Sequence, residues 1–225
     1  MTTSGTATTN FDFTEIAEEA YERCGKELRT GFHLRSARRS LNLLMMDWAN
    51  RGINLWTVEE GSIPMVVGTA TYDLPADTTT LLEVVLRENS GETGQSDYTL
   101  NRLSASSFAQ INNKNTQGRP LQFWEDRQIA STVTVWPVPK SADQTLIYWR
   151  LRRIEDVSSG GQTADVPYRF LPALISGLAY QLSYKIPEAI PLMGALQAEY
   201  ETQFERAADE DREKADFRIT PYFGR

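Results

Sequence analysis

The chain has 225 residues, of which 40% are hydrophobic and 24% charged, and its formal net charge is −7. This composition excludes a disordered chain, and no run approaches the roughly 18 apolar residues that a membrane span needs. The acidic balance argues against a protein whose main task is to grip nucleic acid, because that grip depends on cations that neutralise phosphates. Residues 1–10 are predicted to be a flexible N-terminus without the features of a signal peptide, so we expect the protein to stay in the cytoplasm of the producing cell.

Two amphipathic helices are predicted near the N-terminus. The first begins near Phe13, because Asp12 and Glu15 have the spacing of a capping box. The second covers about 34–51 and is followed by Gly52, a residue typical of a helix C-terminus. Cys24, the single cysteine, falls on the apolar face of the first helix, so we expect a small buried hydrophobe there.

These two helices carry charges of opposite sign. The acidic residues on the first helix are Glu15, Glu18, Glu19 and Glu22. The basic residues near the start of the second helix are Arg35, Arg38 and Arg39. A solvated basic patch is the simpler interpretation, but cations near a helix N-terminus gain nothing from the helix dipole. A contact with a neighbouring subunit or with DNA therefore stays open.

From residue 55 to about 157 the hydrophobic period changes from 3.6 to 2, which predicts short strands. Short strands with short turns favour an antiparallel sheet, in a sandwich or a barrel. A short helix and a polar loop are expected at 104–117. The strands are predicted at 55–60, 70–74, 81–87, 98–103, 121–125, 132–136 and 145–152.

A Ser- and Gly-rich segment at 158–164 has the composition of a flexible linker. The helix predicted at 166–184 is apolar on nearly every side and needs cover from several neighbours. Pro172 either starts its regular part or kinks it, and Gly177 indicates a close approach of another backbone. A closing helix runs to about residue 214. The chain is thus predicted to be α+β, with a helical bundle from 11–54 and 165–214 around an inserted antiparallel β domain.

The last eleven residues, 215–225, are rich in apolar and aromatic side chains directly after a charged helix. Such residues usually need to be buried. They either fold back onto their own domain or dock on another protein, and the sequence favours neither. The residues expected to dock are Phe217, Ile219, Pro221, Tyr222, Phe223 and Arg225.

Motifs for nucleotide binding, metal binding and nucleophilic catalysis are absent from the sequence. No cofactor and no metal are therefore expected. Glu59 and Glu60 could serve a carboxylate-dependent enzyme such as a cell-wall-cleaving factor, but at a strand end such pairs are usually solvated. The strand tryptophans Trp124, Trp136 and Trp149 leave a carbohydrate-binding module as a further alternative, although strand tryptophans are more often core or interface residues.

An ordered set of short segments resembles the head-to-tail adaptors of short-tailed bacteriophages, also called tail tubular protein A or head completion protein. The likeness runs from about residue 11 to 214, and 90–96 and 104–117 depart from it. The matching segments are Ala37-Arg38-Arg39-Ser40-Leu41-Asn42 through Trp48 and Arg51-Gly52, Leu55-Trp56-Thr57-Val58-Glu59-Glu60-Gly61, Tyr72-Asp73-Leu74-Pro75-Ala76-Asp77, Gly118-Arg119-Pro120, Val135-Trp136-Pro137-Val138-Pro139, Tyr148-Trp149-Arg150-Leu151-Arg152, Val166-Pro167 and Leu178-Ala179-Tyr180.

The resemblance implies a structural virion protein without catalytic activity. It implies a ring, usually of twelve copies, at the head-tail junction, where the portal protein and the tail nozzle are its partners and double-stranded DNA passes through the bore. By position in the chain, the C-terminal segment would reach the portal and seal the genome. The two departing regions are expected to vary with a fibre partner. A stopper or a nozzle component of the same virion is the main alternative.

The acidic composition suits a ring of this kind, because a negative bore repels phosphates and lets DNA slide. In a ring, the basic residues of one subunit could also meet the acidic helix of its neighbour. The sequence therefore predicts that Arg35, Arg38 and Arg39 contribute to a subunit interface with the four glutamates of the first helix.

Overall fold

A computed structural model describes residues 11–52 and 55–212. The chain divides into two compact units, one formed by Met1–Trp56 with Ile154–Arg225 and the other by Thr57–Arg153. The first is helical and the second is a β unit, so the predicted α+β class with an inserted β region is confirmed. The predicted N-terminal segment 1–10 lies outside the described residues.

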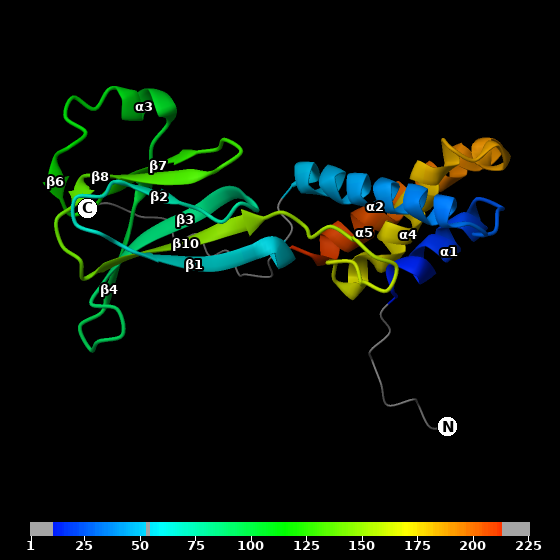
Figure 1. Ribbon diagram of the computed structural model, residues 1–225, viewed down its shortest axis with the longest axis horizontal. Coiled ribbons are helices and arrows are strands. Elements are labelled where there is room, and N and C mark those ends of the chain that lie inside the picture. The colour runs from blue at the N-terminus through cyan, green and yellow to red at the C-terminus, as the bar shows by residue number, and fades with distance from the viewer. Residues whose placement is uncertain (1–10, 53–54, 213–225) are drawn as a thin grey trace, which may run out of the picture. The chain divides into compact units, whose positions relative to one another are not determined.

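Four long helices make up the helical unit (Figure 1). The capping box predicted for the first is present, since Asp12 Oδ1 accepts from the Glu15 amide and Glu15 Oε2 accepts from the Asp12 amide. The second begins earlier than predicted, because Thr30 caps it. The helices are α1 (Phe13–Arg23), α2 (Gly31–Arg51), α4 (Leu171–Ser183) and α5 (Met193–Glu210), and 3₁₀ segments cover Leu55–Thr57, Tyr168–Phe170 and Pro187–Leu192.

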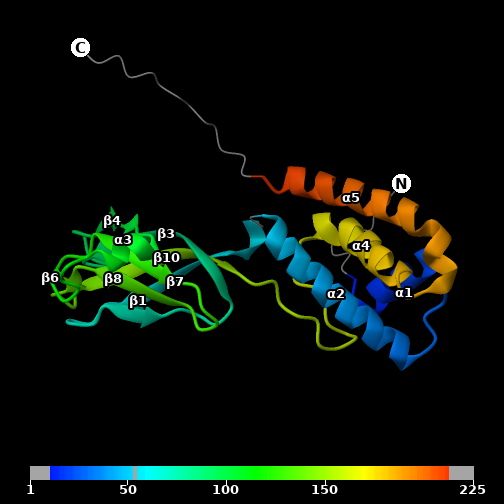
Figure 2. The same ribbon diagram turned by 90° about the horizontal axis from the view of Figure 1, so that it is seen from above.

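Helix α4 lies at the centre of this unit and contacts α1, α2 and α5 (Figure 2). Its side chains are buried on nearly every side, as its composition predicts. Gly177 does allow a close approach, but of side chains and not of backbone. A Cβ atom there would lie 2.8 Å from Leu44 Cδ2 and 2.9 Å from Tyr200 Cε2, so α2 and α5 both press against α4 at this glycine.

The proline in this stretch starts the regular helix and does not kink it. A 3₁₀ turn over Tyr168–Phe170 precedes α4. Pro172 occupies the first turn of α4, where backbone amides have no partner within the helix, so its missing amide proton costs no hydrogen bond. Buried Cys24 packs against the same helix, and its thiol donates to the Ala179 carbonyl oxygen at 3.3 Å. Burial raises the pKa of this thiol to about 11, which fits the inert role predicted for it.

The segment 158–164, predicted as a linker, is hydrogen-bonded to the start of α1. The Phe13 amide donates to the Gln162 carbonyl oxygen and the Thr14 amide to that of Gly160. The Gln162 side chain accepts from the amides of Ser158 and Ser159. Besides connecting the β unit to α4, the segment covers the N-terminal end of α1 and supplies hydrogen-bond acceptors for the first amides of that helix.

Two four-stranded sheets form the β unit, in the orders β1-β10-β3-β4 and β2-β8-β7-β5. Apolar residues of both sheets share one core, which includes Leu86 and Leu146 from the first and Phe123 and Val135 from the second. This is a two-sheet sandwich. The strands are β1 (Val58–Pro64), β2 (Thr71–Asp73), β3 (Thr78–Glu88), β4 (Ser96–Thr99), β5 (Asn101–Arg102), β6 (Gln117–Gly118), β7 (Gln122–Asp126), β8 (Thr132–Trp136), β9 (Val138–Pro139) and β10 (Gln144–Arg152).

The pairing of long strands is antiparallel, as predicted, but two short pairs are parallel. They are β5 with β7 and β6 with β9. Both parallel pairs involve the connection that contains α3 (Ala105–Ala109), the predicted short helix. That connection carries the chain across one sheet, so the strand that precedes it runs in the same direction as the strand that follows.

Candidate subunit-contact surfaces

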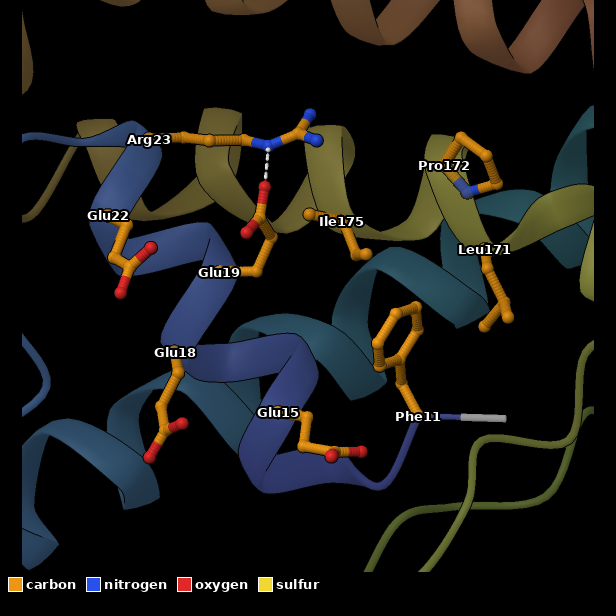
Figure 3. A pocket seen from close by; sticks show the side chains of 9 residues that line it. All are labelled: Phe11, Glu15, Glu18, Glu19, Glu22, Arg23, Leu171, Pro172 and Ile175. Atoms are coloured by element: carbon orange, nitrogen blue, oxygen red, sulfur yellow. Dashed lines mark hydrogen bonds and ion pairs between the residues drawn. The ribbon is translucent and has the colours of Figure 1, made fainter. Parts of the chain in front are cut away.

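A groove of about 540 Å³ lies between α1 and α4 (Figure 3). One side is apolar and is formed by Phe11, Leu171, Pro172 and Ile175. The other side is α1, and in Figure 3 the Glu19 carboxylate points toward Arg23 while those of Glu18 and Glu22 project from the side of α1 that faces away from Ile175. The structure thus brings together the four predicted interface residues Glu15, Glu18, Glu19 and Glu22, with Arg23 beside them.

These glutamates are not equivalent. Glu15 is used in the capping box of α1, and Glu19 accepts from Arg23 Nε at 2.9 Å. Within the described residues, Glu18 and Glu22 form no ion pair. They stand four residues apart on one helix, where like charges destabilise each other. The groove therefore has two exposed carboxylates that a cation from outside could approach.

Helix α2 separates the three arginines that the sequence groups together. Arg38 is half-buried and donates to the carbonyl oxygen of Ser158 within the helical unit. Arg35 and Arg39 are exposed, and neither forms an ion pair with a residue in 11–52 or 55–212. Because they are four residues apart, their side chains share one face of α2.

The same face of α2 exposes three large apolar side chains that are not among the interface residues predicted from the sequence. Phe32 is 63% exposed, Leu43 62% and Met46 54%. They lie opposite the buried face that carries Leu41 and Leu44. A second apolar spacing, three residues apart at positions 43 and 46, is the sequence signal that marks this face.

A further cation lies close to Arg39. Lys185 Nζ donates to Ser40 Oγ at 2.6 Å and to Ser36 Oγ at 3.3 Å. Burial, and after it the positive charge of Arg39, lowers the pKa of the Lys185 ammonium group. The basic character of α2 is therefore reinforced by the segment that follows α4.

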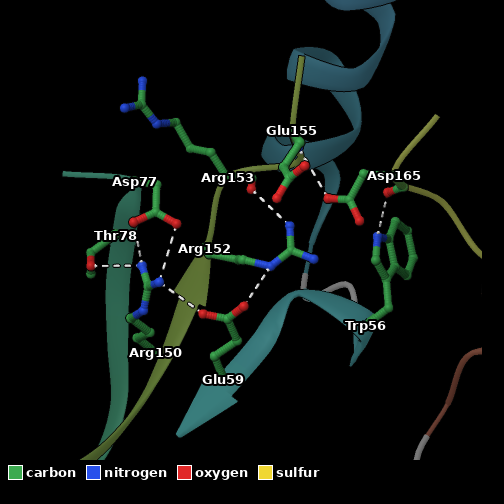
Figure 4. A network of polar contacts seen from close by, with 9 residues as sticks. All are labelled: Trp56, Glu59, Asp77, Thr78, Arg150, Arg152, Arg153, Glu155 and Asp165. Carbon is green, nitrogen blue, oxygen red and sulfur yellow. Dashed lines mark hydrogen bonds and ion pairs between the residues drawn. The ribbon is translucent and has the colours of Figure 1, made fainter. Parts of the chain in front are cut away.

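The carboxylate considered for catalysis is bound by arginines in the β unit (Figure 4). Glu59 Oε2 lies 2.8 Å from Arg150 Nη2, and Glu59 Oε1 lies 2.9 Å from Arg152 Nε. Arg150, which is 8% exposed, also binds both oxygens of Asp77 and the hydroxyl of Thr78. The hydrogen bond and charge of Arg150 hold the pKa of Asp77 below its usual range. Glu59 thus belongs to a structural ion-pair network.

The strand tryptophans do not gather into one platform. Trp124 stacks on Phe108 of α3, with ring centroids 5.0 Å apart, and Trp136 Nε1 donates to the Asn113 carbonyl oxygen. Both therefore hold the α3 connection against its sheet. Trp149 belongs to β10 in the other sheet.

Other predicted features can be placed only in part. All six docking residues, Phe217, Ile219, Pro221, Tyr222, Phe223 and Arg225, lie outside the described residues. In the part of the chain that the structure describes, no group of three or more His, Cys, Asp or Glu side chains could hold a metal ion. None of the described helices is long and apolar enough to cross a membrane.

Comparison with known proteins gives one family. The model of the SU10 adaptor protein family matches residues 15–221, which takes in almost the whole chain and both units. No curated protein matches the chain. The match supports the phage adaptor resemblance in its general form, as a structural protein of a bacteriophage. The chain therefore belongs to the SU10 adaptor protein family.

Proposed function

We propose that this protein is a subunit of a ring-shaped head-to-tail adaptor, with twelve copies as the expected number. The observation that carries the proposal is the SU10 adaptor match over residues 15–221, since it includes both units and much of the C-terminal segment. The ring sits at the head-tail junction of the virion, between the portal protein and the tail nozzle. It assembles in the host cytoplasm, seals the packaged genome and later conducts the DNA.

The charge of the chain suits a conduit. Every copy adds a net charge of −7, so twelve copies give a strongly acidic ring. Acidic walls repel phosphates, and DNA then passes the bore without sequence-specific binding. A ring also needs two different surfaces on each subunit, because a closed ring is built from head-to-tail contacts. The helical unit has surfaces of opposite charge on α1 and α2.

The C-terminal segment is proposed to dock on the portal. Its aromatic residues, Phe217 and Phe223 among them, are anchors of the type that dominate binding energy at interfaces. The β unit carries the α3 connection, which departs from the adaptor resemblance. We therefore assign nozzle contacts, and fibre contacts where fibres exist, to this unit.

Electron microscopy of the purified protein with and without portal complexes tests the adaptor role. Rings stacked on portals are the expected result, and a protein that ignores portals contradicts it. Rings that add only to the far end of an assembled tail would indicate a nozzle component, and rings that bind only to a preassembled adaptor would indicate a stopper.

The docking segment has its own test. Phe217→Ala combined with Phe223→Ala should leave the circular dichroism spectrum unchanged and abolish portal binding in a pull-down. Loss of the folded spectrum would instead place these residues in the core of the protein. Hydrolysis of purified cell wall that is lost in Glu59→Gln and Glu60→Gln variants would favour the enzyme alternative.

A further inference from the structure

The exposed face of α2 forms a continuous stripe. Its members are Phe32, Arg35, Arg39, Leu43 and Met46, which follow one another at intervals of three or four residues. This spacing keeps all five on one side of a helix. We call this face the α2 stripe. Its two arginines lie between Phe32 at one end and Leu43 with Met46 at the other, and large apolar side chains that gather on a surface usually mark a contact with another molecule.

The groove between α1 and α4 has the complementary composition. Its apolar side consists of Phe11, Leu171, Pro172 and Ile175, and its acidic side is the α1 helix with Glu18 and Glu22. We call it the α1–α4 groove. Figure 3 shows the apolar side chains on one side of α1 and the Glu18 and Glu22 carboxylates on the other, so an occupant that lies across α1 would meet both kinds of group.

The charges on the two surfaces have the same spacing. Glu18 and Glu22 are four residues apart on α1, and Arg35 and Arg39 are four residues apart on α2. The two like charges of each pair repel each other within their own helix. When two helices pack side by side, both repulsions are relieved by two ion pairs between the helices. None of these four residues forms an ion pair within 11–52 or 55–212.

We propose that the α1–α4 groove receives the α2 stripe of a second copy of this chain. Arg35 and Arg39 pair with Glu18 and Glu22, while Leu43 and Met46 lie against the apolar side of the groove. The occupant is a second copy because the stripe on this chain matches the groove in both charge and apolar content. Both surfaces belong to one helical unit, on different helices, so the contact is head-to-tail and each copy keeps one surface of each kind open.

This contact would be the subunit interface of the ring, so the inference rests on the proposed function. It also changes the set of interface residues predicted from the sequence. Arg38 is excluded because it is bound to Ser158 within its own unit. Phe32, Leu43 and Met46 are added from α2, and Leu171, Pro172 and Ile175 from α4. Glu15 and Glu19 line the groove but already have partners in the capping box and in Arg23.

Two charge-reversal variants separate the surfaces. The stripe variant combines Arg35→Glu with Arg39→Glu, and the groove variant combines Glu18→Arg with Glu22→Arg. Sedimentation velocity over a range of concentrations should show that the wild type self-associates and that each variant does so on the order of tenfold more weakly or worse. Glu60→Arg with Glu92→Arg is the control, because both glutamates are exposed in the β unit and the net charge changes as in the groove variant.

Mixing the two variants gives the sharpest result. In the mixture the groove variant's wild-type stripe meets the stripe variant's wild-type groove, and the reversed stripe meets the reversed groove, so both contacts between unlike copies are complementary in charge. The expected product is a restored assembly, larger than either variant forms alone, in which the two variants alternate in equal numbers. Native mass spectrometry identifies it by mass. A mixture that stays monomeric, or variants that associate as the wild type does, would overturn the proposal.

The apolar half of the contact is tested by Leu43→Ser with Met46→Ser. Both side chains are exposed, so the thermal unfolding midpoint should stay unchanged while self-association weakens by a similar factor. A chain that ends at Arg212 tests the competing occupant, the C-terminal segment. If truncation strengthens binding at the groove and the stripe variant has no effect, the groove belongs to that segment and the proposal is wrong.

These outcomes are distinct from those for the adaptor role. A wild type that remains monomeric at every concentration overturns the contact, whereas portal binding in the electron micrographs is scored independently. Stripe and groove variants that still form wild-type rings on portals would refute the contact and leave the adaptor role standing.

Discussion

The two units of this protein differ in whether their charged side chains form ion pairs within the unit. In the β unit, Arg150 and Arg152 share Glu59, and Arg87 binds both oxygens of Asp97. In the helical unit, Arg35 and Arg39 lie on one helix and Glu18 and Glu22 on another, with no ion pair to the described residues. The β unit pairs these arginines internally. The helical unit also pairs Arg23, Arg51 and Arg169 internally, but it leaves the four charges named above on separate surfaces. This difference is the reason why we propose that self-association uses the helical unit.

The apolar residues show a related difference. The helical unit has one core centred on α4, and a separate apolar set on the outer face of α2. The core explains why the helices fold together, but it does not use Phe32, Leu43 or Met46. The following predictions test the contrast between the units, from the largest expected effect to the smallest.

Each unit should depend on its own core. Leu174 of α4 and Leu146 of β10 are both fully buried, so Leu174→Ala and Leu146→Ala should each lower the free energy of unfolding by about 2–5 kcal/mol. Denaturant titrations followed by circular dichroism measure this loss. Because the two cores consist of different residues, Leu174→Ala should shift the helical signal first and Leu146→Ala the β signal first. Identical shifts of both signals in both variants would show a single cooperative fold.

The internal pairing of the β unit should appear as an acid dependence of stability. Arg150 lowers the pKa of Asp77, so the stabilisation is present above the ordinary carboxyl range and is lost as the pH falls through the lowered pKa. Asp77→Asn should reduce the free energy of unfolding at neutral pH by about 0.5–1 kcal/mol, since the carboxylate is partly exposed.

The same variant should have a flatter stability profile than the wild type below about pH 5. Urea titrations at several pH values give that profile. Asp126→Asn is the control, because Asp126 lies on a strand of the same unit and, among the described residues, accepts from Gln128 Nε2 and forms no ion pair with an arginine. Parallel profiles for the wild type and Asp77→Asn would contradict the assignment of the acid dependence to this pair.

Alanine substitutions at two neighbouring arginines of α2 should have opposite effects: one should lower stability and the other should weaken self-association. Arg38→Ala removes the hydrogen bond to Ser158 and should lower the free energy of unfolding by about 0.5–1.5 kcal/mol. Arg39→Ala should change it by less than about 0.5 kcal/mol, because the side chain is exposed. It should also raise the pKa of Lys185, since the nearby charge that lowers it is gone.

Thermal unfolding and sedimentation velocity of the two variants measure both effects. Arg39→Ala should weaken self-association and Arg38→Ala should not. The reverse pattern would return Arg38 to the interface and remove Arg39 from it.

Local patterns in the sequence predicted much of the secondary structure. Asp12 and Glu15 located the start of α1 because a capping box involves only neighbouring residues. Period-two alternation at 132–136 predicted β8 with its observed bounds. It failed at 55–57, where a 3₁₀ segment replaces the start of the predicted strand, because a short apolar run does not separate these conformations.

The candidate interface was predicted only in part, because sequence spacing shows which residues share a helix face but not which contacts that face makes. The four glutamates of α1 were correctly placed on one side of a helix, and the structure brings all four to the groove. Arg38 was grouped with Arg35 and Arg39 by proximity in the chain, while its contact to Ser158 spans 120 residues. Whether that grouping or the revised one forms the interface stays a prediction.

The sequence by itself determined the helix and strand periods, the buried position of Cys24 and the need of α4 for neighbours on several sides. These depend on residue type and local spacing. Only the tertiary structure decided that Leu44 and Tyr200 meet at Gly177, and that α1 and α4 enclose an acidic groove while the outer face of α2 stays open. The physical reason is that a helix face becomes a surface or a core only when residues from distant parts of the chain pack against it or leave it exposed.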